Sequence, residues 1–197
     1  MTKFNVILFN GFETLDAFGP VEVIGWLSKM YSLSYYSIAG GIVKSAQQVP
    51  IDTLPFAKIN TSGVLLIPGG MGTRDLVNDA HFVGQLKMLA KKAPYVLSVC
   101  TGSALLAKTN LLNGVKATSN KMAFEWVRSN GAKVDWIKKA RWVKDGKYYT
   151  SSGVCAGIDM TLGFVSDLHG KETAHIITKD IEYIWNSDAD NDPFAVG

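Results

Sequence analysis

Short apolar runs alternate with segments of helical periodicity along most of the chain. The runs are rich in β-branched and aromatic residues and end at Gly, Pro or Asn, which predicts strands at residues 4–9, 33–38, 64–67, 95–99 and 115–118. Apolar positions at helical spacing predict helices over residues 16–29, 80–92, 103–108, 121–129, 155–168 and 171–185. This alternation predicts an α/β fold with a parallel sheet and helices on both of its faces.

Three segments refine this picture. The run at residues 64–67 has no in-out alternation, as is typical of a central strand buried on both sides. Asp145-Gly146, between residues 141–144 and 147–151, predicts a β-hairpin with a type I′ turn. A shorter hairpin is expected between Gly41 and Thr53. Residues 187–197 are polar and predicted to be irregular, and without a linker residues 1–197 are expected to form a single domain.

Composition and charge exclude several classes of protein. The chain has 197 residues, of which 47% are hydrophobic and 19% charged, close to ordinary globular proteins. Lys and Arg exceed Asp and Glu by 20 to 17, and the basic residues are scattered, so a nucleic-acid-binding protein is not favoured. No apolar stretch approaches the length of a membrane helix, and residues 4–9 are too short for a secretory signal, so no membrane partner is expected.

The cysteines and histidines indicate neither a disulfide framework nor a metal site. Cys100 and Cys155 are the only cysteines, which favours a cytoplasmic protein with reduced thiols. The three histidines (His81, His169 and His175) show no metal-ligand spacing with either cysteine. We therefore expect no metal and no cofactor.

Candidate chemistry gathers at the ends of three predicted strands, where ligands bind in open parallel sheets. Cys100 stands on a strand-to-helix turn, where unpaired backbone N–H groups stabilise a thiolate. Gly69 and Gly70 follow another strand and allow amides to face a ligand, while the loop after the first strand carries Glu13 and Asp16. Together these loops would supply a nucleophile, an acid and oxyanion donors.

Each of these residues also has a structural interpretation. A lone cysteine is usually a small buried hydrophobe, and packing is the expected role of Cys155. Asp16 by itself is typical of a helix N-cap or first turn, and the Gly69-Gly70 pair of a tight turn. His81 and His175 are expected to be ordinary surface or core histidines.

Five segments, among which the one at Cys100 is the most specific, resemble the ThiJ/PfpI superfamily, relatives of class I glutamine amidotransferases. They are Leu15-Asp16 with Gly19-Pro20, Ile67-Pro68-Gly69-Gly70, Ser98-Val99-Cys100-Thr101-Gly102-Ser103, Leu111-Leu112 with Gly114, and Ala156-Gly157-Ile158-Asp159. The resemblance covers nearly the whole chain and implies a flavodoxin-like fold and a homodimer. Within the superfamily, the chain looks most like isocyanide hydratases and the amidotransferase-like domain of some AraC-type regulators.

Departures from the superfamily pattern narrow the expected activity. Thr101 follows the nucleophile where PfpI-type peptidases have a histidine, and Ser119-Asn120-Lys121 stands where many other members have one. The chain therefore lacks the proton donor that an amine leaving group requires, which disfavours peptidase or amidase activity. A DNA-binding regulator is not expected either, because the chain stops at Gly197 without room for a helix-turn-helix domain.

The resemblance to isocyanide hydratases implies a cysteine and aspartate enzyme acting on a small-molecule substrate. Cys100 would attack the isocyanide and Asp16, with Glu13 as the alternative, would supply the proton, giving a thioimidate and then an N-substituted formamide. The amides of Gly70 and Thr101 are the expected donors to developing charge. Gly69, Met71 and Asn120 complete the expected site, and Phe18 and Trp26 are expected in its wall or in the core. A thiol-oxidation sensor or stress protein, a ligand-binding relative without activity, and a small-amide hydrolase remain alternatives.

Overall fold

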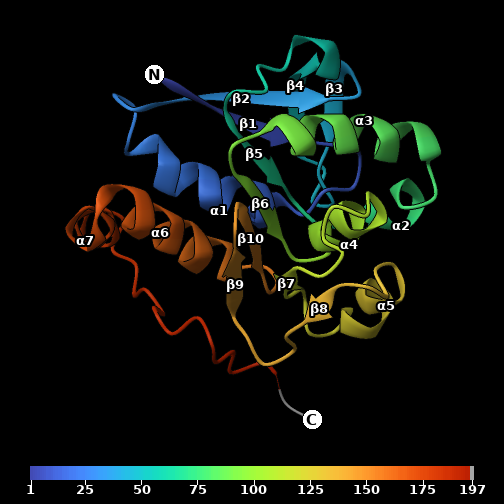
Figure 1. Cartoon of the computed structure of the whole chain (residues 1–197). Coiled ribbons are helices and arrows are strands. Elements are labelled where there is room, and N and C mark those ends of the chain that lie inside the picture. The colour runs from blue at the N-terminus through green and yellow to red at the C-terminus, as the bar shows by residue number, and fades with distance from the viewer. Residues whose placement is uncertain (196–197) are drawn as a thin grey trace.

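An eight-stranded sheet forms the centre of the computed structural model, which describes residues 1–195 (Figure 1). Its strand order is β3-β4-β2-β1-β5-β6-β10-β9, and a separate two-stranded ribbon is made by β7 and β8. The strands are β1 (Thr2–Ile7), β2 (Tyr31–Ser37), β3 (Ala39–Lys44), β4 (Pro50–Pro55), β5 (Val64–Ile67), β6 (Val96–Val99), β7 (Lys116–Ala117), β8 (Asp135–Trp136), β9 (Trp142–Asp145) and β10 (Tyr148–Ser151).

The inner strands of the sheet are parallel, from β4 through β2, β1, β5 and β6 to β10. Only the edge strands β3 and β9 are antiparallel to their neighbours. Every residue of β5 and β6 is buried, as expected for strands covered on both faces. The carboxyl ends of β1, β5 and β6 therefore meet at one edge of the sheet, which is where the predicted functional loops begin.

Helices cover both faces of the sheet. Figure 1 shows α1, α6 and α7 on one side and α3 and α4 on the other, while α5 lies beside the small β7-β8 ribbon. The helices are α1 (Thr14–Gly25), η1 (Phe56–Lys58, a 3₁₀ turn), α2 (Thr73–Leu76), α3 (Ala80–Lys92), α4 (Gly102–Lys108), α5 (Phe124–Ser129), α6 (Ala156–His169) and α7 (Lys171–Asp180). This arrangement confirms the predicted α/β fold of the flavodoxin-like kind.

The predicted elements agree with the structure to different degrees. The strand at 64–67 and the helix at 80–92 have the predicted bounds, and both expected hairpins are present. The strand predicted at 115–118 is shorter and lies in the separate ribbon, and the last helix ends at Asp180 instead of residue 185. The prediction of a type I′ turn was wrong, because only Gly146 of the two central residues has a positive φ, 57°.

Residues 187–195 form no helix or strand, as predicted, yet this segment is anchored to the sheet. The carbonyl of Ala189 accepts the backbone N–H groups of Arg141 and Trp142, and the N–H of Asp192 donates to Lys139. The Asp192 side chain is fully buried beside the cationic groups of Lys121 and Arg141. We call residues 183–195 the C-terminal strap.

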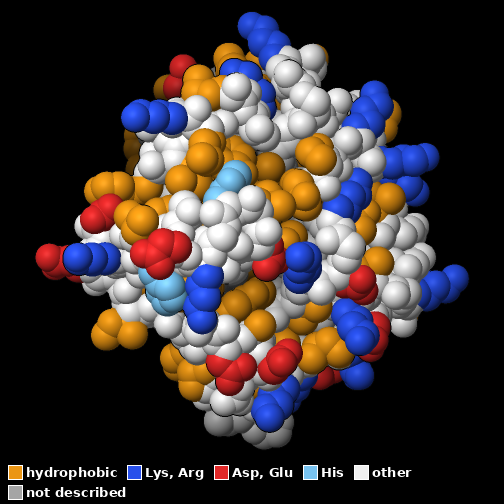
Figure 2. Space-filling model, turned by 60° about the vertical axis from the view of Figure 1, so that its left-hand side comes forward, with side chains coloured by type: hydrophobic (Ala, Val, Ile, Leu, Met, Phe, Trp, Pro, Cys, Tyr) orange, Lys and Arg blue, Asp and Glu red, His pale blue; other side chains and the backbone are white. Residues whose placement is uncertain are grey.

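The surface shows no continuous basic face in the view of Figure 2, where Lys and Arg side chains are separated by acidic, apolar and uncharged ones. Within the described part of the chain, no helix is long and apolar enough to cross a membrane.

Candidate active site

Cys100 occupies a strained turn between β6 and α4. Its φ is 57°, in the left-handed region that non-glycine residues rarely adopt. The surroundings fix this conformation from both ends of the residue. The N–H of Cys100 donates to the carbonyls of Ser151 and Ser152, each at 3.2 Å, and its carbonyl accepts the hydroxyls of Ser103 (3.0 Å) and Ser119 (2.8 Å). The turn thus lifts the thiol out of the strand, as predicted for a nucleophile.

Asp16 lies in the first turn of α1 and is completely buried. Its Oδ2 accepts the backbone N–H of Gly69 at 2.9 Å, and its Oδ1 is buried without a close hydrogen-bond partner. The Asp16 carboxyl and the Cys100 thiol lie close enough to perturb each other's ionisation. The structure therefore brings together the two residues that the sequence singled out for catalysis.

Burial dominates the ionisation of this pair. It raises the pKa of Asp16 to about 8, opposed by the Gly69 N–H and the Cys100 thiol and reinforced by the Glu13 carboxylate. Burial also raises the pKa of the Cys100 thiol, with the Asp16 carboxylate adding to the rise and Thr101 opposing it. Two negative charges side by side are costly here, so the pair carries at most one negative charge at neutral pH.

The glycines after β5 allow the loops to approach closely. A Cβ atom on Gly69 would lie 2.5 Å from the Thr101 nitrogen and 2.9 Å from Oδ2 of Asp16, so only glycine fits there. The Gly70 N–H donates to Oγ1 of Thr101 at 3.0 Å. This hydrogen bond occupies the Gly70 N–H, which was one of the two expected oxyanion donors. The Thr101 N–H faces the Cys100 sulfur instead and lowers the pKa of the thiol against the larger effect of burial.

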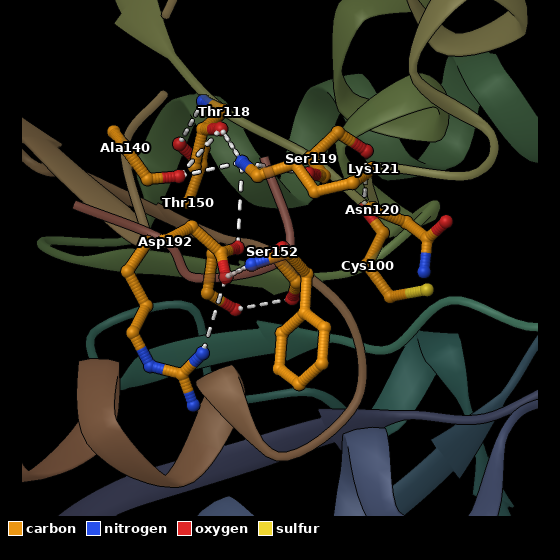
Figure 3. Close-up of polar contacts among 12 residues, drawn as sticks. Cys100, Thr118, Ser119, Asn120, Lys121, Ala140, Thr150, Ser152 and Asp192 are labelled. Carbon is orange, nitrogen blue, oxygen red and sulfur yellow. Dashed lines mark hydrogen bonds and ion pairs between the residues drawn. The ribbon is translucent and has the colours of Figure 1, made fainter. Parts of the chain in front are cut away.

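Asn120 provides a further donor beside the thiol. Its Oδ1 accepts the Ala123 N–H at 2.9 Å, which orients the amide, and its Nδ2 has no acceptor among the described residues. A Cβ atom on Gly153 would lie 2.2 Å from this Nδ2 and 3.2 Å from the Cys100 sulfur, so both groups flank the same glycine. Figure 3 shows the Asn120 and Cys100 side chains pointing to the same side.

A cavity of about 380 Å³ opens over the Cys100 thiol. It contains four of the predicted site residues besides Cys100, namely Gly70, Met71, Thr101 and Asn120, and Gly69 lies behind them holding Asp16. Sequence reasoning missed its other lining residues, which are Arg74, Met122, Ala123 and Val154. Glu13 lines the cavity too, but its Oε1 accepts the Gln47 amide at 2.9 Å.

Two residues, Trp26 and Cys155, lie elsewhere than expected, whereas Phe18 takes the core position that was one of its two predicted alternatives. Phe18 packs against Phe12 and Tyr35 in the core, and Trp26 is 49% exposed and donates to Glu22, so neither forms the cavity wall. Cys155 is exposed, which contradicts the packing role predicted for it, because the N-terminal end of α6 projects to the surface there. It lines a neighbouring cavity of about 310 Å³.

The described residues contain no cluster of three or more His, Cys, Asp and Glu side chains arranged to hold a metal ion. His81 and His175 are exposed on helices, and none of the cavity-lining residues is a histidine.

Comparison with known proteins identifies relatives of this chain in sequence and in fold. Residues 2–167 match the model of the DJ-1/PfpI family. The isonitrile hydratase of Pseudomonas putida is 30% identical over 177 residues, which cover 90% of this chain and 76% of the hydratase. A solved ThiJ/PfpI family protein from Pseudomonas syringae superposes with a TM-score of 0.84 and 28% identity, covering 98% of this chain and 76% of that protein. DJ-1beta of Drosophila melanogaster superposes with a TM-score of 0.79 at 22% identity, covering 93% and 99% of the two chains.

Proposed function

The chain belongs to the DJ-1/PfpI family, and we propose that it is a cysteine-dependent enzyme that hydrates an isocyanide (isonitrile) to an N-substituted formamide. The observation that carries this proposal is the buried pair of Cys100 and Asp16, in which a pKa of about 8 keeps the carboxyl protonated at neutral pH. Addition to an isocyanide requires a nucleophile that attacks the terminal carbon and an acid beside it that protonates the same carbon. The similarity to isonitrile hydratase supports the same reaction.

The first half of the reaction joins the Cys100 thiolate to the substrate, after the thiol has released its proton to solvent and Asp16 has kept its own. The Cys100 sulfur bonds to the terminal carbon of R–N≡C while Asp16 transfers its proton to that carbon, giving a thioimidate and an Asp16 carboxylate. The Thr101 N–H stabilises the thiolate before attack, and the Asn120 amide, which flanks Gly153 together with the Cys100 sulfur, donates to charge that develops on the substrate.

The second half releases the product with the aid of the same carboxylate. A water oxygen adds to the thioimidate carbon, one water proton ends on the nitrogen and the other on Asp16. The C–S bond breaks as the carbonyl forms, which restores the thiolate and the protonated acid. No amine leaves, so the reaction needs no histidine, and the cavity has none.

Turnover of a simple alkyl or aryl isocyanide tests the proposal. The wild type is expected to form the formamide, and Cys100→Ser and Asp16→Asn are expected to lose most activity. Cys155→Ser, whose thiol lies outside the Cys100 cavity, serves as the matched control and should retain it. Absence of formamide from the wild type refutes the hydratase. Full activity in Asp16→Asn, with loss in Cys100→Ser, would keep Cys100 as the nucleophile and reject Asp16 as the proton donor.

A thiol-oxidation sensor is the second candidate, favoured by the same geometry. A protonated Asp16 beside Cys100 is also suited to donate a hydrogen bond to a sulfinate formed on that sulfur. Selective addition of two oxygens to Cys100 under mild peroxide, seen by mass spectrometry in a protein that turns over no isocyanide, would favour the sensor. A small-amide hydrolase is less well supported, because none of the described residues that line the cavity is a histidine that could protonate a leaving amine.

We also propose that residues 1–197 act as one catalytic domain in a cytoplasmic homodimer. Apolar side chains on the β3-β4 hairpin, including Ile42 (69% exposed) and Leu54 (43%), supply surface for a second copy to cover. Light scattering coupled to size-exclusion chromatography measures this mass directly, and a monomer at micromolar concentration contradicts the dimer.

A further inference from the structure

Arg74 brings a fixed positive charge to the cavity that holds Cys100. The residue lies in the short helix α2 and lines the cavity together with Met71 from the preceding turn. Its guanidinium carbon stands 3.5 Å from the ring centroid of Trp126 on α5. Stacking at this distance holds the planar group in one orientation and leaves its N–H groups pointing outward from its edges.

This guanidinium has no anionic partner among the described residues. The other two arginines are paired, Arg128 with Glu125 at 2.9 Å and Arg141 with Asp159 at 2.6 Å, whereas no carboxylate oxygen of residues 1–195 lies within ion-pair distance of Arg74. Glu13 shares the cavity but forms no ion pair with Arg74. An oriented guanidinium with free donors is a site for a carboxylate, which it binds through two parallel hydrogen bonds.

The cavity combines this charge and the nucleophile with an apolar lining. Its apolar lining residues are Met71, Met122, Ala123 and Val154. The nucleophile Cys100 lines it together with Thr101 and Asn120, and α2 contributes Arg74. A ligand that fits these features has an apolar body, a reactive carbon at one end and an anionic group at the other.

We propose that Arg74 binds a carboxylate of the substrate, and that the substrates are isocyanides carrying a carboxylic acid. This inference rests on the proposed isocyanide hydration for the identity of the reactive end. The recognition of an anion by Arg74 stands on the stacking and the missing counter-ion alone.

A matched pair of substrates tests the proposal. Formation of formamide from 4-isocyanobenzoate and from its methyl ester is measured with the wild type, Arg74→Gln and the control Arg128→Gln. Both variants remove one positive charge, but Arg128 lies outside the cavity and is paired with Glu125. We expect the wild type and Arg128→Gln to favour the carboxylate over the ester, and Arg74→Gln to reduce the ratio of the two kcat/KM values about tenfold or more. An unchanged ratio in Arg74→Gln overturns the inference even though the hydratase activity stands.

Alkylation of Cys100 tests Arg74 without any isocyanide. In a Cys155→Ser background, rates of modification by iodoacetate and by iodoacetamide are compared by mass spectrometry. The anionic reagent should gain from Arg74, so the rate ratio of iodoacetate to iodoacetamide should fall in Arg74→Gln and stay unchanged in Arg128→Gln. Equal iodoacetate-to-iodoacetamide ratios in the Cys155→Ser background, Arg74→Gln and Arg128→Gln overturn the anion site. If the ratio falls in Arg74→Gln but the wild type turns over no isocyanide, only the proposed reaction is rejected.

Discussion

Gly69 donates its backbone N–H to Oδ2 of Asp16 at 2.9 Å, and within residues 1–195 this is the one close hydrogen bond of a fully buried carboxyl. One donor does not compensate for the loss of water, so burial raises the pKa of Asp16 from 3.8 to about 8. Between these two values the unfolded chain releases this proton while the folded chain retains it. The contribution of Asp16 to stability therefore falls as pH rises from about 4 to 8.

Asp16→Asn is expected to remove this pH-dependent cost. Asparagine retains an oxygen for the Gly69 N–H and carries no charge at any pH. The melting temperature of the variant relative to the wild type should therefore rise steadily from pH 5 to pH 8, measured by thermal unfolding at each pH. Glu22→Gln, which alters an exposed carboxylate on the same helix, should show no such trend. A difference independent of pH would contradict the raised pKa of Asp16.

The same pKa predicts how activity depends on pH. If Asp16 gives its proton to the substrate carbon, kcat/KM for isocyanide hydration should fall as pH rises above about 8, because the carboxyl loses that proton. Initial rates from pH 6 to pH 10 measure this directly. A kcat/KM that instead climbs through pH 8 would indicate that ionisation of the Cys100 thiol, whose pKa burial also raises, limits the reaction.

The sequence correctly predicted those residues whose position follows from a local sequence pattern, such as a helix cap or the end of a strand. Asp79 caps α3 by accepting the N–H groups of His81 and Phe82, so the bounds of that helix were predicted correctly. Cys100 and Asp16 each follow a strand of the parallel sheet, and such ends meet by the rules of the fold.

Residues whose role depends on the tertiary approach of distant segments could not be predicted. Ser119 acts through its contact with the Cys100 carbonyl, and Arg74 through stacking on Trp126, 52 positions later in the chain. The last helix was predicted too long for the same reason. Tyr183 and Trp185 continue an apolar pattern, but they pack as part of the C-terminal strap, where both donate to Asp159.

Asn120→Asp should separate the two functions of the Asn120 amide. The aspartate keeps an acceptor for the Ala123 N–H, so the loop should retain its conformation, but the donor beside Cys100 is lost. We expect kcat for isocyanide hydration to fall about a hundredfold with little change in melting temperature, since removal of an oxyanion donor has an effect of this size. Asn113→Asp, an exposed asparagine outside the cavity, is the control. Unchanged kcat in Asn120→Asp would exclude the amide from the reaction.

The strained turn at Cys100 predicts an unusual order of stability among its variants. Because φ is 57° there, glycine should adopt the conformation without strain, and Cys100→Gly should be more stable than Cys100→Ala by about 1 kcal/mol. Cys155 has a right-handed conformation with φ −69°, so Cys155→Gly should be no more stable than Cys155→Ala. Urea unfolding measures all four variants, and the same order at both positions would argue against stored strain at Cys100.

Lys121 and Asp192 connect the C-terminal strap to the loop that carries Ser119 and Asn120. Figure 3 shows the Lys121 ammonium reaching toward Asp192, and the two charges lie 3.6 Å apart with both side chains buried. The same ammonium donates to the Ala140 carbonyl at 2.6 Å and to Oγ1 of Thr118 at 2.9 Å. Burial lowers the pKa of Lys121 to about 8, and Asp192 opposes that fall.

Asp192→Asn is therefore expected to be strongly destabilising near neutral pH. It leaves the Lys121 and Arg141 cations buried beside a neutral amide, and removal of one partner from a buried pair costs about 3–5 kcal/mol. Glu125→Gln breaks an exposed pair with Arg128 and should cost less than about 1 kcal/mol. The attraction between Lys121 and Asp192 is lost as pH rises through the folded pKa of Lys121, about 8, so the deficit of Asp192→Asn should be smaller at pH 9.5 than at pH 7. Urea unfolding at both values measures it, and a deficit as small as that of Glu125→Gln would show that the strap is held by its backbone contacts instead.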